Sequence, residues 1–328
     1  MAKNRKATMA DVAKHAGVSL GTVSKVVNNI HVGESYKKKV LKAIDELDYQ
    51  VNTYARTLKS NKSNLVALII PNTITPFFSA LAQYVNDALQ RQGYTMLLAF
   101  TEYNLQLEKE ILQMAYQRKV AGIIVLSYNP DLIIPDDIPF VSIDRAFPGK
   151  VPCVSSDNYT GGYMAAQKLH ELGADKLAFF RVGSNLSNEP NKRKDGFFSY
   201  CTSHKVDFTA KILDDSEDRN EFAKFIDENI IDGKLRFNGI FCVTDLLAYN
   251  IIKLLKERNI RIPEDVQVIG FDGTRMFGTE EYYCSTIVQP VEQIAKTCVD
   301  IVLYTESKYP NAVISLPVKY APSGTTKD

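Results

Sequence analysis

Polar side chains that could bind or transform a small molecule follow several apolar, strand-like segments of this 328-residue sequence. They include carboxylates, an amide, a hydroxyl and a guanidinium. Ligands of open parallel sheets bind beyond the carboxyl ends of the strands, so we expect these side chains to line one site. The candidate residues are Ser127, Asp144, Arg145, Asp245, Asp272 and Gln289.

Two kinds of chemistry suit this set of side chains. Charged groups form strong hydrogen bonds to the hydroxyls of a polyhydroxylated ligand, and the rings of Phe77, Phe78 or Phe147 can pack on the apolar face of a sugar. A carboxylate cluster also resembles an acid/base pair. The sequence contains no phosphate-binding loop, no G-x-S-x-G, no H-E-x-x-H and no G-x-G-x-x-G. We therefore expect binding without catalysis and without a cofactor.

The five cysteines indicate neither a metal site nor disulfides. Their number is odd, and none lies in a C-x-x-C pair or beside a histidine cluster, so we interpret them as reduced thiols. The basic N-terminus is not followed by an apolar stretch, and no apolar run reaches the roughly 18–20 residues of a membrane-spanning helix. We expect a cytoplasmic, nucleoid-associated protein with no membrane partner.

The elements that must position the candidate side chains alternate between strands and helices from residue 64 onward. Apolar segments predict strands at 65–70, 95–100, 122–127, 140–144, 176–182, 210–214, 239–243 and 266–272. Amphipathic segments predict helices near 77–92, 105–118, 159–172, 192–203, 219–231, 244–258 and 290–306. This alternation is typical of parallel sheets covered on both faces, so the predicted fold class is α/β with two doubly wound lobes. We expect crossings between the lobes after Asp157, around Gln289 and near Tyr320.

The charge of the sequence is unevenly distributed. Residues 1–62 contain 12 Lys or Arg and 5 Asp or Glu, a net charge of +7, whereas the rest of the chain carries −6. A basic head on an acidic body is typical of a nucleic-acid-binding protein. A solvated basic tail is the plain alternative, but these basic residues lie in helical patterns and not in a low-complexity run.

The basic head contains two short predicted helices. Thr8 can cap a helix at 9–16, Gly17 supplies a turn, and Ser19 can cap a second helix. The valines of the second helix lie on one side and can pack against the first. The opposite side is small and polar, so the helix can enter the major groove of DNA.

Polar residues of this second helix can contact DNA. Thr22, Ser24 and Asn28 can bond phosphates, and Lys25 can reach a guanine edge. A third helix is predicted at 34–47, with Val40, Leu41, Ile44 and Leu47 facing inward and Lys37 to Lys39 facing outward. The periodicity alone fits a generic three-helix bundle equally well.

The run T-M-A-D-V-A-K-H-A-G-V-S-x-x-T-V-S-K-V-V-N at residues 8–28 closely resembles the helix-turn-helix of the LacI/GalR (lactose-repressor) family of transcription factors. Residues 52–60, NTYARTLKS, resemble the hinge helix of that family, and the similarity continues through the remaining chain. The resemblance implies an all-α DNA-binding head and a body like the periplasmic sugar-binding proteins. The implied domains are a head at 1–49, a hinge at 50–63 and an effector-binding and dimerisation body at 64–328.

The resemblance also implies the boundaries of the two lobes. Lobe 1 is expected at about 64–158 and 291–319, and lobe 2 at about 159–290 and 320–328.

The resemblance assigns further DNA contacts. Leu20, Gly21 and Lys25 lie where the family reads bases. Because Gly21 has no side chain, Leu20 and Lys25 are expected to carry most of the readout, and Thr8 and Ser19 complete the set in the head. In the hinge, Leu58 is expected to insert into the minor groove and kink the duplex. The other expected hinge contacts are Asn52, Ala55 and Lys59.

The resemblance adds one cation to the effector site. The segment KRKDGF resembles an R-x-x-G-F/W motif, so Arg193 corresponds to an effector-contacting arginine, Asp272 to the acidic ligand and Gln289 to a cleft residue. Phe77 and Phe78 take the place of an aromatic pair that stacks on purines in the purine repressor. The family often supplies a further aromatic residue from the second lobe, and this residue is missing near Leu213. Its absence favours a sugar or sugar phosphate over a purine as the effector.

Each of these assignments has a structural alternative. Asp245 or Asp272 can cap a turn or helix, Phe77 and Phe78 can belong to the core, and Arg193 can pair with Glu189 or Asp195. Leu58 can be a plain packing residue.

The predicted function is that of a transcriptional regulator, most simply a homodimeric repressor of carbohydrate-utilisation genes that binds a pseudo-palindromic DNA operator. A sugar or sugar phosphate between the lobes is expected to control its operator affinity. A regulator controlled by a partner protein or a non-sugar metabolite stays open. A solute-binding protein is a further alternative, but the basic head and the lack of a signal-like apolar stretch argue against it.

Overall fold

The computed structural model of the chain describes residues 7–27, 30–49, 63–127, 129, 131–134, 137–147, 151–183, 188–276, 278–304 and 312–327. The chain divides into two compact units, Met1–Lys62 and Ser63–Asp328. None of the helices among these residues is long and apolar enough to cross a membrane. All five cysteines are buried and free.

Three helices form the core of the first unit: α1 (Met9–Ala16), α2 (Leu20–Val27) and α3 (Glu34–Glu46). Their buried residues meet in one apolar cluster, made of Val12, Ala13, Val23, Val26, Val40 and Ala43, which Tyr49 joins from beyond α3. Each helix contributes only two residues to this cluster, and helices this short are marginal in isolation, so the three depend on one another.

One residue of α3 departs from the prediction. Leu41 is half exposed, whereas Ala43 is buried. Val40, Ala43 and Ile44 follow the spacing of one helical face, and Leu41 lies about 100° away from Val40. The inward assignment of Leu41 was therefore wrong.

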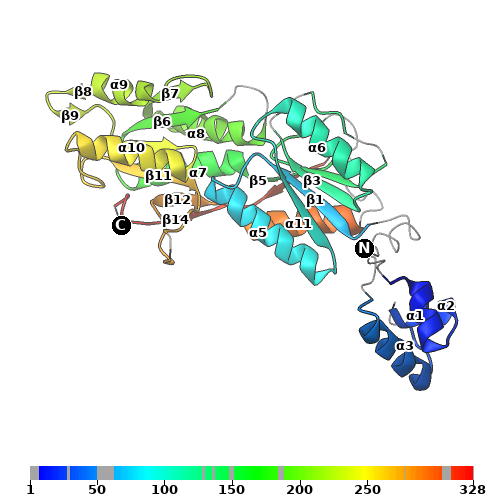
Figure 1. The fold of residues 1–328 in the computed structure, drawn as a ribbon. Coiled ribbons are helices and arrows are strands. Elements are labelled where there is room, and N and C mark those ends of the chain that lie inside the picture. Colours follow the sequence, from blue (N-terminus) through cyan, green and yellow to red (C-terminus); the bar gives the residue numbers. More distant parts are fainter. Residues whose placement is uncertain are drawn as a thin grey trace, which may run out of the picture. The chain divides into compact units, whose positions relative to one another are not determined.

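The second unit contains two six-stranded sheets, which we name sheet A and sheet B (Figure 1). Sheet A has the order β13-β5-β4-β3-β1-β2 and sheet B the order β14-β12-β11-β10-β6-β7. All neighbouring strands are parallel except β12 and β14. The strands of sheet A are β1 (Leu65–Ile70), β2 (Thr95–Phe100), β3 (Gly122–Leu126), β4 (Phe140–Ile143), β5 (Cys153–Ser156) and β13 (Val313–Leu316). Those of sheet B are β6 (Lys176–Val182), β7 (Asp207–Leu213), β10 (Gly239–Cys242), β11 (Gln267–Asp272), β12 (Ser285–Val288) and β14 (Lys319–Ala321).

Helices cover both faces of sheet A. α5 (Pro76–Arg91) and α11 (Val291–Tyr304) share one apolar cluster with it, and α6 (Leu105–Gln117) shares another. Residues that alternate along β1 enter different clusters, Leu68 the first and Ile69 the second. Since successive strand residues point to opposite faces, α6 lies across the sheet from α5 and α11. We call sheet A with these helices lobe 1.

Sheet B is covered in the same way. Phe179 packs against Phe198 of α8 (Lys192–His204), whereas the next residue, Phe180, packs against Phe222 of α9 (Asn220–Glu228). α7 (Asn158–Glu171) packs against α8, and α10 (Asp245–Glu257) packs against α9. We call sheet B with these helices lobe 2. A two-stranded ribbon, β8 (Ile230–Ile231) and β9 (Lys234–Leu235), follows α9, and a 3₁₀ turn, Glu189–Asn191, precedes α8.

The chain passes between the lobes three times: from β5 to α7, from β12 to α11 and from β13 to β14. The predicted long strands and the helices of both lobes are present with shifts of a few residues. The short strands β5, β12, β13 and β14 were not predicted. Their three or four residues are rich in serine and threonine or lie at a sheet edge, so they lack the apolar run that marks a buried strand.

Candidate DNA-binding and effector sites

Thr8 is the N-cap of the first head helix. Its backbone N–H donates to Asp11 Oδ2 at 2.8 Å, and its hydroxyl accepts from the Asp11 N–H at 3.3 Å, which completes a capping box. The helix ends at Gly17, whose φ of +63° is a left-handed conformation that favours glycine. These two residues fix where α1 begins and ends.

The second head helix presents the predicted reading residues to solvent. The Ser19 hydroxyl accepts from the Thr22 N–H at 3.1 Å, as a cap does. Leu20 is 53% exposed, and Gly21 and Lys25 are also exposed. Thr22 and Ser24 are half-buried, and the valines of α2 face the core. The exposed side of α2 thus begins with one apolar residue and ends with one cation.

Five of the predicted DNA contacts lie outside the described residues: Asn28, Asn52, Ala55, Leu58 and Lys59.

Arg193 lies in the first turn of α8 and is almost completely buried. Its Nε donates to Asn158 Oδ1 at 2.7 Å, and its Nη1 donates to the Val243 carbonyl at 2.6 Å. Its guanidinium carbon is 3.6 Å from the centroid of the Phe271 ring, and Nη1 is 3.9 Å from Asp272 Oδ1. Arg193 therefore takes part in a buried network.

The neighbouring acids that could have paired with Arg193 have other partners. Glu189 pairs with Lys192 at 2.7 Å, and Asp195 lies 3.8 Å from Lys194.

Gln289 joins the two lobes. Its Nε2 donates to Asp272 Oδ1 at 2.8 Å, and its Oε1 accepts from the Ser156 hydroxyl at 2.7 Å. Ser156 ends β5 in lobe 1, and Asp272 ends β11 in lobe 2. The crossing segment after β12 thus contacts the carboxyl ends of a strand in each sheet.

Asn158 makes a second connection between the lobes. Its Nδ2 donates to the Ser155 hydroxyl at 2.9 Å, and that hydroxyl donates to Asp144 Oδ1 at 2.6 Å. The Glu189 N–H of lobe 2 donates to the Asp144 carbonyl at 2.9 Å. We name the connected set the inter-lobe network: Asp144, Ser155, Ser156, Asn158, Arg193, Asp272 and Gln289.

Burial raises the pKa of the network carboxyls. The pKa of Asp272 rises to about 7, mainly because the side chain is buried. The charge of Arg193 opposes this rise, and the charge of Asp245 adds to it. Burial likewise raises the pKa of Asp144, against a hydrogen bond from Ser155. A ligand that brings hydrogen-bond donors would favour the charged forms of both groups.

Several predicted effector residues lie outside the network. Asp245 is buried and accepts from the Thr274 N–H at 2.6 Å and from the Thr286 hydroxyl at 2.7 Å, so it holds the loop after β11. Burial raises its pKa. Phe77 and Phe78 are 7% and 5% exposed and belong to the core of lobe 1, as does Phe147. Packing thus uses most of the surface of these rings.

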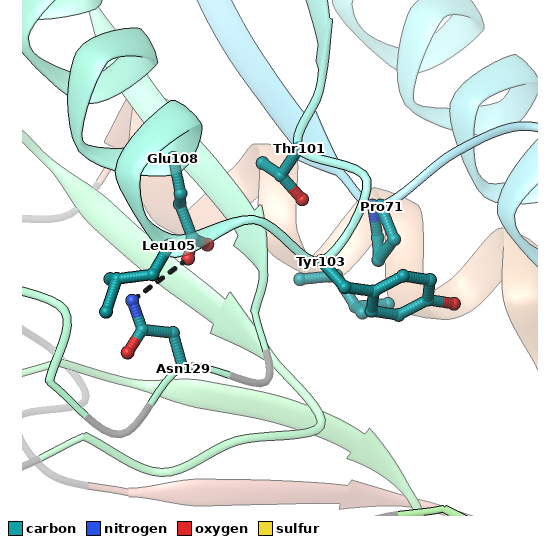
Figure 2. A pocket seen from close by; sticks show the side chains of 7 residues that line it. Pro71, Thr101, Tyr103, Leu105, Glu108 and Asn129 are labelled. Carbon is teal, nitrogen blue, oxygen red and sulfur yellow. Dashed lines mark hydrogen bonds between the residues drawn. The ribbon is translucent and has the colours of Figure 1, made fainter. Parts of the chain in front are cut away.

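Ser127 and Arg145 lie beside a pocket of lobe 1. The pocket has a volume of about 150 Å³ and lies where β1, β2 and β3 end (Figure 2). Its lining residues are Pro71, Thr101, Tyr103, Leu105, Glu108, Leu126 and Asn129. Ser127 accepts from the Asn129 N–H at 3.0 Å, and the charge of Arg145 acts on Glu108.

Four of these residues were not predicted from the sequence: Ser155, Ser156, Asn158 and Glu108. The first three belong to the run S-S-D-N at 155–158, whose polarity at the end of a short strand was a usable signal. Glu108 has no such signal, because a glutamate in the first turn of a helix is common at the surface.

Similarity to known proteins agrees with this architecture. A family model described as bacterial regulatory proteins, lacI family, matches residues 8–52, and a periplasmic binding protein-like domain matches residues 166–326. The sucrose operon repressor of Pediococcus pentosaceus is 32% identical over 325 residues, which cover 96% of this chain and 98% of that protein. The ribose operon repressor of Bacillus subtilis is also 32% identical, over 98% of this chain and 99% of that protein. The chain belongs to the LacI family of bacterial regulatory proteins.

Membership of the LacI family decides the class of function. The chain is a DNA-binding transcriptional regulator and not an enzyme, and the solute-binding alternative is excluded. The crystal structure of a lac repressor dimer bound to operator and an anti-inducer has the same fold, with a TM-score of 0.82 and 21% identity over 98% of this chain and 99% of that chain. The predicted α/β fold class with an all-α head and two doubly wound lobes is confirmed.

Proposed function

We propose that this LacI-family regulator is a homodimeric repressor of carbohydrate-utilisation genes, and that a sugar or sugar phosphate bound between the lobes controls its affinity for a pseudo-palindromic operator. The observation that carries the proposal is the inter-lobe network, which places two carboxylates, two amides and a guanidinium at the carboxyl ends of strands from both sheets. These groups suit vicinal hydroxyls. The names of the sucrose and ribose operon relatives agree with a sugar.

The proposed effector contacts are Asp144, Arg145, Arg193, Asp272 and Gln289, with Ser127 at the margin. Asp245 acts by holding the loop that follows Asp272. Phe77 and Phe78 shape the site from within the core of lobe 1. Because the network bonds connect the lobes, a ligand that replaces them changes the angle between lobe 1 and lobe 2.

The proposed DNA contacts in the head are Leu20 and Lys25 for bases, with Thr22 and Ser24 for phosphates. Thr8 and Ser19 cap the two helices and position their N–H groups for phosphates. In the hinge we propose Leu58 as the residue that enters the minor groove, from its place in the sequence. We propose the domain limits 1–49, 50–63 and 64–328 and a nucleoid location in the cytoplasm.

Exposed apolar side chains support a homodimer through the body. β2 is an edge strand of sheet A and ends in Phe100, which is 41% exposed. On lobe 2, Leu246 and Tyr249 of α10 are exposed, and the Tyr249 ring meets the Tyr283 ring edge-on at 5.0 Å. Exposed apolar residues gathered on an edge strand and a helix favour contact with another subunit.

The test measures DNA affinity with and without sugars. The chain first selects its operator from a random DNA pool, and fluorescence anisotropy then follows operator binding in the presence of sucrose, ribose and their phosphate esters. We expect at least one compound to change the operator dissociation constant tenfold or more. Arg193→Ala should abolish that response, whereas Lys192→Ala, which removes an exposed neighbouring cation, should retain it. An Arg193→Ala variant that responds like the parent chain contradicts the proposed site.

A further inference from the structure

The pocket of lobe 1 has an apolar wall and a polar floor. In Figure 2, Tyr103 and Pro71 lie on one side, and Glu108 faces Asn129 on the other. Glu108 comes from the first turn of α6, and Asn129 follows β3. The pocket therefore lies at the sheet edge from which the predicted effector residues of lobe 1 also emerge.

Glu108 has an unsatisfied oxygen in this pocket. The side chain is 4% exposed, and Oε2 accepts from Asn129 Nδ2 at 3.3 Å. Among the described residues, Glu108 Oε1 is the one buried side-chain oxygen or nitrogen without a hydrogen-bond partner. Leaving a buried acceptor unmatched is costly, whereas a leucine at this position would extend the apolar wall at no such cost. The oxygen therefore indicates a donor that arrives with a ligand.

The carboxylates that act around this pocket outnumber the cations. Burial raises the pKa of Glu108, while the side chains of Ser127 and Asn129 and the charge of Arg145 lower it. The charge of Asp131 also acts on Arg145, and that of Asp215 acts on Tyr103 at the pocket wall. Because one guanidinium faces several carboxylates here, an added anion would be repelled, and an added cation would compete with Arg145.

We propose that this pocket is a subsite of the effector site, that it binds an uncharged hydroxyl group through Glu108 Oε1, and that Glu108 excludes a phosphate group from it. The inference rests on the proposed function and narrows it from a sugar or sugar phosphate to an unphosphorylated sugar at this end of the ligand. A hydroxyl supplies the donor that Oε1 lacks, and the wall of Pro71, Tyr103 and Leu126 suits the carbon that bears it.

The test compares each sugar with its phosphate ester by isothermal titration calorimetry on the full chain. The probes are sucrose with sucrose 6-phosphate and ribose with ribose 5-phosphate. We expect the parent chain to bind one neutral sugar at least tenfold more tightly than its ester. Glu108→Gln should reduce that ratio at least tenfold, because the amide carries no charge and can donate to a phosphate. Glu110→Gln, an exposed neighbour on α6, should leave the ratio unchanged.

The outcomes separate this inference from the proposed function. A parent chain that prefers the ester, or a ratio that Glu108→Gln leaves unchanged, overturns the inference and leaves the sugar effector in place. Failure of every sugar and ester to bind the parent chain overturns both. A crystal structure with the bound sugar should show a hydroxyl oxygen about 3 Å from Glu108 Oε1, and a hydroxyl elsewhere contradicts the assignment.

Discussion

Asp272 illustrates how burial sets the behaviour of a single residue in the inter-lobe network. Its pKa is about 7 in the folded chain, against an ordinary value of 3.8, with burial as the main cause. The folded state thus holds this proton more tightly than the unfolded state. The resulting stability is fully present below pH 3.8 and is lost as the pH rises through about 7.

Asp272→Asn removes this titration and keeps an acceptor for Gln289. The parent chain loses stability as the pH rises from about 5 to about 8, whereas the variant does not. We therefore expect the difference in unfolding free energy between variant and parent to shift by about 2 kcal/mol in favour of the variant over this range. Urea unfolding at the two pH values measures the difference. Asp207→Asn, at an exposed carboxylate, is the control. A gap between Asp272→Asn and the parent that stays constant with pH would contradict the assigned cause.

The sequence predicted single residues well where local chemistry decides their role. The caps Thr8 and Ser19 follow from short-range hydrogen bonding, and both are present. Asn158 was missed because its role depends on Ser155 and on Arg193, which is 35 positions away. Contacts over that range follow from tertiary packing, which periodicity does not encode.

At the scale of elements, the contact between α7 and α8 positions Arg193. A Cβ atom added at Gly162 would lie 1.9 Å from the Arg193 carbonyl oxygen, and one added at Gly196 would lie 1.9 Å from the Tyr159 carbonyl oxygen. The two backbones approach so closely that only glycine fits at either position. The same approach brings Arg193 within reach of Asn158 at the start of α7.

Gly162→Ala should therefore push the helices apart. We expect a loss of about 1–3 kcal/mol of unfolding free energy, together with a weaker sugar response, because Arg193 moves away from Asn158. Chemical denaturation and operator anisotropy measure the two effects. Gly324→Ala is a matched control, because a Cβ there meets nothing within 4 Å. Stability equal to that of the parent chain would show that α8 can shift without loss.

The elements that the sequence predicted share a strong local pattern. The six- and seven-residue strands β1, β2 and β6 are apolar runs, and α5 and α6 carry clear amphipathic stripes. β5, with the sequence CVSS, was missed because its buried residues include two serines that serve the network. The weakest strand signal thus coincides with the candidate site.

At the scale of the whole molecule, effector and operator must act on each other. If a sugar changes operator affinity by some factor, the operator changes sugar affinity by the same factor, since both steps close one thermodynamic cycle. We expect calorimetric sugar dissociation constants, measured with and without saturating operator, to differ by the factor that anisotropy gives. Arg193→Ala should bring both factors to one. Unequal factors would mean that the two assays follow different species.

The three passages between the lobes also have a consequence for biosynthesis. Sheet A receives its strand β13 only after residues 313–316 have been made, and sheet B receives β14 only after residues 319–321. Neither lobe can therefore complete its sheet before residues 313–321 have been made, although the other strands of both sheets precede them in the chain. Loss of this one short segment would leave an incomplete sheet in both lobes at once.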